Sequence, residues 1–195
     1  LEEIEDRPAT TPAPAWVGSE DCLTLNVWTP AADGARRPVI VFLHGGANWL
    51  ESSRLRVYHG ESFVRRGDVV FCSVNYRLGV FGFLDLSDAG LEGCHSNGLR
   101  DQLLALEWIH ANVAAFGGDP DNITVMGESA GSMDLSWLLT TGRLDGRIRR
   151  AVLMSGVAGV PGLAETREDA YYTPQHAREQ ARELLPLLGC RSAAE

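Results

Sequence analysis

The sequence predicts an α/β fold in which a mostly parallel central sheet is flanked by helices. Two near-continuous apolar runs, at residues 38–44 (PVIVFLH) and 69–76 (VVFCSVNY), are typical of strands covered on both faces. Apolar residues repeat every three or four positions across residues 99–116, which predicts a long amphipathic helix. Such segments alternate along the chain, and this favours a parallel sheet whose ligands bind beyond the carboxyl ends of the strands.

The remaining predicted elements extend this alternation in both directions. Residues 22–29 (CLTLNVWT) alternate with a period of two, which indicates a strand before the two central ones. Residues 58–66 carry a helical pattern, and GGDP at 117–120 is typical of a helix stop and turn. The later elements are expected to be a short strand at 122–126, a helix at 129–139, a strand at 151–154 and a helix at 173–188 interrupted at Pro186.

The composition excludes several classes of function. There are 17 basic against 26 acidic residues, a net charge of −9, which argues against a nucleic-acid binder because such proteins need concentrated positive charge. Every basic residue is Arg, so no lysine is available for a Schiff base or a phosphate-binding loop. The four cysteines lie too far apart for a zinc site, and the sequence indicates no cofactor. No apolar run approaches the roughly 20 residues that span a bilayer.

A serine stands between two glycines at residues 127–131 (GESAG), directly after a predicted strand and directly before a predicted helix. Turning a strand into a helix within one residue strains the backbone of Ser129, and the flanking glycines leave room for strand and helix to approach closely. The Ser129 hydroxyl then projects above the sheet, where the helix start presents free N–H groups. The pattern alone is weak evidence, because chance produces it in about one chain in ten of this composition.

A second glycine turn supports the same chemistry. HGGA at residues 44–47 follows the first apolar strand and is the type of turn that supplies backbone donors to an oxyanion hole. Either turn alone has an ordinary structural explanation as a glycine turn. Together, each in the strand-end context that its motif requires, they favour a serine hydrolase.

Six segments together identify a resemblance that runs nearly end to end. They are SEDCLTLNVWTP (19–30), HGGA (44–47), NYRLGVFGFL (75–84), GLRDQ (98–102), FGGDPDNITVMGESAG (116–131) and RAVLMSG (150–156). With these segments the chain resembles the type-B carboxylesterases, the family of carboxylesterases and cholinesterases with the α/β-hydrolase fold. The resemblance implies that Ser129 is the nucleophile and that the N–H groups of Gly46, Ala47 and Ala130 form the oxyanion hole. It also implies that Glu128 is a buried acidic neighbour supporting the triad histidine.

The rest of the catalytic triad is not recognisable in this chain. α/β-hydrolases follow the order Ser, then Asp or Glu, then His, and in the resembled family the last two lie well beyond Glu195. We therefore expect residues 1–195 to be an internal fragment, the N-terminal and central part of one catalytic domain that is incomplete at both ends. A complementary chain carrying the acid and the histidine is then a candidate partner.

Two local histidines are the alternatives for the missing base. His176 follows Ser129, and Glu165, Glu168 and Asp169 lie between them, but His176 falls on an amphipathic helix where a solvated role is the default. His95 lies in a loop where the family usually has Gly-Asn across His95-Ser96. A structural role is preferred for His95 because no acid stands at a recognisable spacing.

Other positions depart from the family pattern or bear on the cysteines. Residues 48–51 (NWLE) replace an aromatic residue and a small Gly-containing stretch, and Asp134 replaces a serine. Either change could alter specificity; the alternatives are a rearranged surface loop and an exposed acid favoured by the helix dipole. Cys72 is expected to be a buried free thiol, whereas Cys22 and Cys190 match half-cystines of relatives and are either free or orphaned.

The sequence thus predicts a bacterial serine hydrolase that acts on small-molecule carboxylic esters through an acyl-enzyme on Ser129. One alternative is a catalytically silent cholinesterase-like binding or adhesion domain, against which the intact GESAG argues. Another is a fragment that is inactive without its complementary chain. The sequence leaves the compartment undecided between cytoplasmic and secreted.

Overall fold

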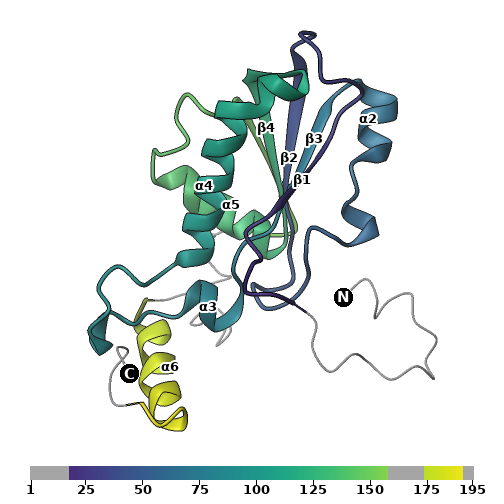
Figure 1. Ribbon diagram of the computed structural model, residues 1–195. Coiled ribbons are helices and arrows are strands. Elements are labelled where there is room, and N and C mark those ends of the chain that lie inside the picture. The colour runs from purple at the N-terminus through teal and green to yellow at the C-terminus, as the bar shows by residue number, and fades with distance from the viewer. Residues whose placement is uncertain (1–17, 158–173, 191–195) are drawn as a thin grey trace, which may run out of the picture.

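A computed structural model describes residues 18–157 and 174–190, and within them the chain forms a mixed sheet covered by helices (Figure 1). The strands are β1 (Leu25–Trp28), β2 (Arg37–Leu43), β3 (Val70–Val74), β4 (Gly118–Glu128) and β5 (Arg150–Met154). The α-helices are α2 (Glu61–Gly67), α3 (Gly79–Phe83), α4 (Asn97–Asn112), α5 (Ala130–Thr140) and α6 (Pro174–Leu187), and the 3-10 helices are η1 (Arg56–Tyr58), η2 (Ser87–Ala89) and η3 (Val113–Phe116). None of the described helices is both long and apolar enough to cross a membrane.

The strands are ordered β1-β3-β2-β4-β5, and every neighbouring pair is parallel except β1 with β3. Parallel pairing places Leu43 at the end of β2 beside Val74 of β3 and Gly127 of β4. The chain therefore leaves three neighbouring strands at the same level, and the segments that follow them meet at one edge of the sheet.

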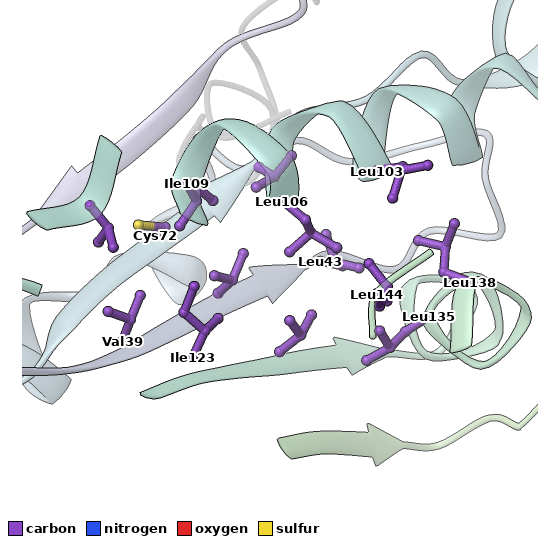
Figure 2. Close-up of a cluster of buried hydrophobic side chains, with 14 of the residues drawn as sticks. Val39, Leu43, Cys72, Leu103, Leu106, Ile109, Ile123, Leu135, Leu138 and Leu144 are labelled. Atoms are coloured by element: carbon purple, nitrogen blue, oxygen red, sulfur yellow. The ribbon is translucent and has the colours of Figure 1, made fainter. Parts of the chain in front are cut away.

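The core lies between the sheet and helices α4 and α5 (Figure 2). Alternate residues of the central strands face these helices because side chains in a strand alternate between its two faces. The fully buried members include Val39, Leu43, Leu106, Ile109 and Leu135. This face supplies most of the apolar burial that holds α5, and with it the residues preceding α5, against the sheet.

The opposite face of the sheet is covered by α2 and η1, which lie across the sheet from α4 (Figure 1). Phe63 of α2 stacks on Phe71 of β3 with ring centroids 5.0 Å apart, and Tyr58 packs on Phe42 at 4.9 Å. A methyl group on Gly60 would lie 2.5 Å from the Phe71 ring, so the chain can enter α2 this close to β3 only with glycine at that position.

The structure confirms the predicted α/β class and the predicted central parallel strands. Several boundaries differ, and two of these differences have a clear physical cause. The helix expected at 58–66 is interrupted between η1 and α2, where Gly60 packs on β3. The turn expected at 117–120 is confined to Gly117, which has a φ of 79°, and the next residues already belong to β4. The register between β2 and β4 shifts between Arg37 and Val39. With this irregularity β4 begins at Gly118, before the position at which the GGDP turn predicts its start.

The core predicts unequal effects for two leucines of α4. Leu106 is 2% exposed and Leu104 is 60% exposed. Leu106→Ala should lower the free energy of unfolding by about 2–5 kcal/mol, because it removes buried methyl groups and leaves a cavity. Leu104→Ala should change it by less than about 0.5 kcal/mol. Denaturant unfolding of the protein in its full natural length measures both, and equal effects would contradict the described packing of α4.

Candidate active site

Ser129 sits in a tight turn between β4 and α5. Its backbone has φ 50° and ψ −118°, outside the regions that a residue with a side chain ordinarily adopts. Its N–H donates to the carbonyl of Met154 on β5 at 2.8 Å, and its carbonyl accepts from the N–H groups of Ser132 and Met133 in α5. The helix predicted from residue 129 therefore begins at Ala130, and Ser129 itself is the strained, half-buried residue in front of it.

The two glycines of GESAG are required by close backbone contacts. A methyl group on Gly127 would lie 2.4 Å from the Gly131 carbonyl oxygen, and one on Gly131 would lie 2.4 Å from the carbonyl oxygen of Leu43. Both obstacles are main chain, which cannot move aside as a flexible side chain would. The close approach of strand and helix expected from the sequence is therefore present, and it extends to β2.

The HGGA turn packs directly against Ser129. A methyl group on Gly45 would lie 3.0 Å from Cβ of Ser129 and 2.5 Å from Oε2 of Glu128. Gly46 has a φ of 88°, and a methyl group there would lie 2.4 Å from the carbonyl oxygen of Leu50. The turn is closed by the N–H groups of Trp49 and Leu50, which both donate to the Gly46 carbonyl.

The candidate oxyanion donors lie on these two adjoining turns. Ala130 is the first residue of α5, so its N–H has no acceptor one turn earlier in the helix. Among the described residues, no backbone hydrogen bond outside the helices and strands is donated by Gly46 or Ala47. Free N–H groups beside a serine and at the positive end of a helix can stabilise a negative oxygen.

Glu128 is the last residue of β4 and stands beside Met154 of β5. It is half-buried, with its carboxylate against Gly45. The sequence interpretation of Glu128 as an acid that supports a histidine stays a prediction. Its position at the strand end, next to Ser129, is compatible with that role.

The surroundings of Asp134 differ from those of the exposed acid that the sequence offered as one alternative. It is 2% exposed, so the alternative of a solvated first-turn acid is wrong. Its Oδ1 accepts a hydrogen bond from the Asn48 side chain at 3.1 Å, and its Oδ2 accepts one from Gln102 of α4 at 2.6 Å. Burial raises the pKa of Asp134 to about 6, although the bonds from Gln102 and Asn48 lower it in part.

The contact between Asp134 and Asn48 joins two of the positions at which the sequence departs from the family pattern. These residues are 86 positions apart, and each was interpreted separately as a change in the pocket or on the surface. The available signal was that a residue after HGGA and a residue of the nucleophile helix both depart from the family pattern, to an amide and to a carboxylate. Gln102, the third member of the network, lies in the GLRDQ segment, and the sequence alone assigns it no role.

The histidines weighed as alternatives lie in other surroundings. His176 is on α6, which forms ion pairs with η2 and the segment before it, from Arg182 to Asp88 and from Arg178 to Asp85. The suggested acid partners of His176 lie outside the described residues. His95 is exposed, with Nε2 3.4 Å from the Arg100 guanidinium. His44 is buried, its Nδ1 is 3.0 Å from the Gly45 carbonyl, and burial lowers its pKa.

The residues after HGGA and the cysteines complete the description. Trp49 is 64% exposed and lies over Gly79, while Glu51 has a φ of 76° and accepts a hydrogen bond from the Tyr58 hydroxyl. Cys72 is a buried thiol whose pKa burial raises to about 12, as expected. The other described cysteines, Cys22, Cys94 and Cys190, are also free thiols.

A largely parallel sheet with a strained serine between a strand end and a helix defines the class as a partial α/β-hydrolase. Comparisons with known proteins then identify the family. The model of the carboxylesterase family matches residues 2–195, and the chain belongs to this family.

Individual relatives and solved structures agree with that assignment. The chain is 44% identical to the para-nitrobenzyl esterase of Bacillus subtilis over 140 residues, covering 72% of this chain and 29% of the relative. It is 47% identical to the phenmedipham hydrolase of Pseudarthrobacter oxydans over 141 residues, covering 72% and 28%. The crystal structure of a Geobacillus stearothermophilus carboxylesterase superposes with a TM-score of 0.81 at 41% identity, covering 95% of this chain and 38% of that one. The chain thus matches less than a third of the length of these two relatives.

The raised pKa of Asp134 predicts how stability changes with pH. A carboxyl that holds its proton more tightly when folded makes the free energy of unfolding fall as the pH rises from about 4 to about 6. The shift from 3.8 to about 6 corresponds to about 3 kcal/mol. Asp134→Asn removes this pH dependence. The free energy of unfolding of the variant relative to wild type should therefore rise by about 3 kcal/mol between pH 4 and pH 7.

Denaturant unfolding at several pH values, on the protein in its full natural length, measures this difference. Asp85→Asn is the matched control, because Asp85 is also buried. Burial raises the Asp85 pKa, but the hydrogen bonds from Ser87 and the nearby Arg178 and His95 together outweigh it and hold that pKa below its usual value. The wild-type advantage over Asp85→Asn should therefore be lost as the pH falls, the opposite direction. The same trend in both variants would contradict the assignment.

Proposed function

We propose that this chain carries the nucleophile and the oxyanion hole of a serine hydrolase of carboxylic esters, in a bacterial enzyme of the carboxylesterase family. The observation that carries the proposal is the strained backbone of Ser129, held where the GESAG and HGGA turns touch. Strain of this kind persists only where the surrounding structure imposes it, and it is common at catalytic residues.

The proposed reaction has two halves. The Oγ of Ser129 attacks the ester carbonyl carbon while its proton passes to a histidine base, and the carbonyl oxygen becomes negatively charged. The N–H groups of Gly46, Ala47 and Ala130 donate to this oxyanion. The C–O bond to the alcohol then breaks, the alcohol leaves with the proton, and water releases the acyl group from Ser129 by the same steps.

The histidine base and its acid partner complete the proposed triad. In α/β-hydrolases they follow the nucleophile in the chain. We infer that they are supplied by residues beyond Glu195, with residues 1–195 forming the N-terminal and central part of the catalytic domain. Glu128, the last residue of β4 and the neighbour of Ser129, is the acid that we propose supports this histidine.

The names of the relatives support a small-molecule ester as substrate. They include a para-nitrobenzyl esterase and a phenmedipham hydrolase, both bacterial. Trp49 is exposed and lies over Gly79, which begins α3, and Val80 and Phe81 of α3 are also exposed. We propose that these residues offer an apolar surface for an acyl or alcohol group.

Labelling of Ser129 by a fluorophosphonate tests the proposal. In the protein at its full natural length, the probe should modify Ser129, and Ser129→Ala should lower kcat for a p-nitrophenyl ester by about four orders of magnitude or more. Ser19→Ala, at an exposed serine outside both glycine turns, should leave both readouts unchanged.

The outcomes separate the alternatives. Intact-mass spectra with peptide mapping locate the adduct, and ester hydrolysis is measured on the same samples. A folded full-length protein that neither reacts nor hydrolyses esters would support a silent binding or adhesion domain. Labelling of the 195-residue chain only after a separate chain is added would support the fragment that needs a complement.

A further inference from the structure

A buried polar cluster connects the HGGA turn to the two helices behind it. The carboxylate of Asp134 on α5 receives the Asn48 amide on Oδ1 and the Gln102 amide on Oδ2. Asn48 follows the candidate donor Ala47 directly, and Gln102 lies on α4. One side chain thus holds the turn, the nucleophile helix and a core helix together.

The cluster is costly, which points to a role beyond packing. Asp134, Asn48 and Gln102 are 2%, 4% and 0% exposed. The contacts described for the Asp134 carboxylate are two neutral amides, and no cation pairs with it in the described residues. A buried carboxylate without a cation is less stable than a well-packed apolar group would be. Such a group is retained more readily where its geometry is needed.

The turn that Asp134 holds is itself unfavourable. Gly46, Ala47 and Asn48 have φ values of 88°, 54° and 59°, three successive residues in the left-handed region. The two that carry side chains prefer other conformations by roughly 1–2 kcal/mol each. The turn therefore needs external contacts to keep the N–H groups of Gly46 and Ala47 in one orientation.

Asn48 supplies those contacts through its backbone carbonyl and both polar atoms of its side chain. Its backbone carbonyl accepts from the Gly79 N–H at 2.7 Å, its side-chain N–H donates to Asp134, and its side-chain oxygen is 3.4 Å from the Tyr76 hydroxyl. Tyr76 also donates to the His44 carbonyl at 2.7 Å, at the start of the same turn. Of these contacts, only the one to Asp134 ties the turn to α5.

We propose that Asp134 is a positioning residue that fixes, through Asn48, the N–H groups of Gly46 and Ala47 relative to the N–H of Ala130. This positioning stabilises the oxyanion and not the ester in the ground state, because the N–H groups that Asp134 orients donate to the oxygen that becomes charged. This inference rests on the proposed function and assigns to Asp134 and Asn48 a part in it.

The chemistry of the cluster predicts which substitutions preserve the role. Asparagine at position 134 keeps an acceptor oxygen for Asn48, and its amide can donate to the side-chain oxygen of Gln102, which has no partner within the described residues. Alanine keeps neither bond. Asp134→Asn should therefore rescue what Asp134→Ala loses.

The test compares kinetics in the protein at its full natural length. Asp134→Ala should lower kcat for a p-nitrophenyl ester by about 10–100-fold with KM changed by less than about threefold, because misplaced donors weaken transition-state stabilisation and leave substrate binding in place. The affinity for a trifluoromethyl ketone, whose adduct with the serine carries an oxyanion, should fall by a similar factor. Asp134→Asn should restore kcat to within about threefold of wild type.

Two further variants separate positioning from general stability. Leu138→Ala, at a core residue of α5 that is 4% exposed, should destabilise the protein without changing the ketone affinity relative to KM. Asn48→Ala cuts the same hydrogen bond from the turn and leaves α5 unchanged, so it tests the idea even if Asp134→Ala does not fold. The double variant should lose no more kcat than the worse single variant.

Three results would overturn the proposal: equal losses in Asp134→Ala and Leu138→Ala, a rise in KM at constant kcat, or no rescue by asparagine. Failure of the proposed function would look different. Either the wild-type protein would hydrolyse no ester or Ser129→Ala would retain esterase activity, and the positioning role of Asp134 would fall with it.

Discussion

The close contact of α5 with the ends of β2 and β4 is the constraint on which the rest of this structure depends. Gly131 lies so near the Leu43 carbonyl, and Gly127 so near the Gly131 carbonyl, that neither position has space for a side chain. A helix placed this near a strand end leaves one residue in which to reverse direction, and Ser129 takes the strained conformation as a result. Burial of Leu135 and Leu138 in the core holds the helix in place.

The register of the sheet then determines what surrounds Ser129. Leu43, Val74 and Gly127 stand at the same level, so Gly45, Tyr76 and Ser129 each lie two residues beyond that level. Because the strands are parallel and adjacent, these residues meet although they are far apart in the chain. The contact of Gly45 with Ser129 and the hydrogen bond from Tyr76 to His44 are direct consequences.

Local sequence was sufficient for the features that depend on local backbone. The GESAG glycines and the position of Ser129 before a helix could be predicted because a strand, a turn and a helix are encoded within about ten residues. The Asp134 network could not be predicted, because its three members lie in three separate segments of the chain. Each of them alone resembles a surface polar group. The start of β4 was missed for the same reason: it depends on pairing with β2, whereas GGDP by itself indicates a turn.

Conformational strain and buried charge are concentrated on one side of the sheet edge. The features concerned are the left-handed turn at Ala47 and Asn48, the strained backbone of Ser129 and the buried carboxylate of Asp134, and they lie close together. The layer beneath them is apolar and well packed. Each of these features costs folding free energy, and only that core can offset the sum. A chain selected for stability alone would replace Asp134 and Asn48 by an apolar pair of similar volume. Their presence in contact with the HGGA turn is what the proposed positioning of its N–H groups toward an oxyanion requires.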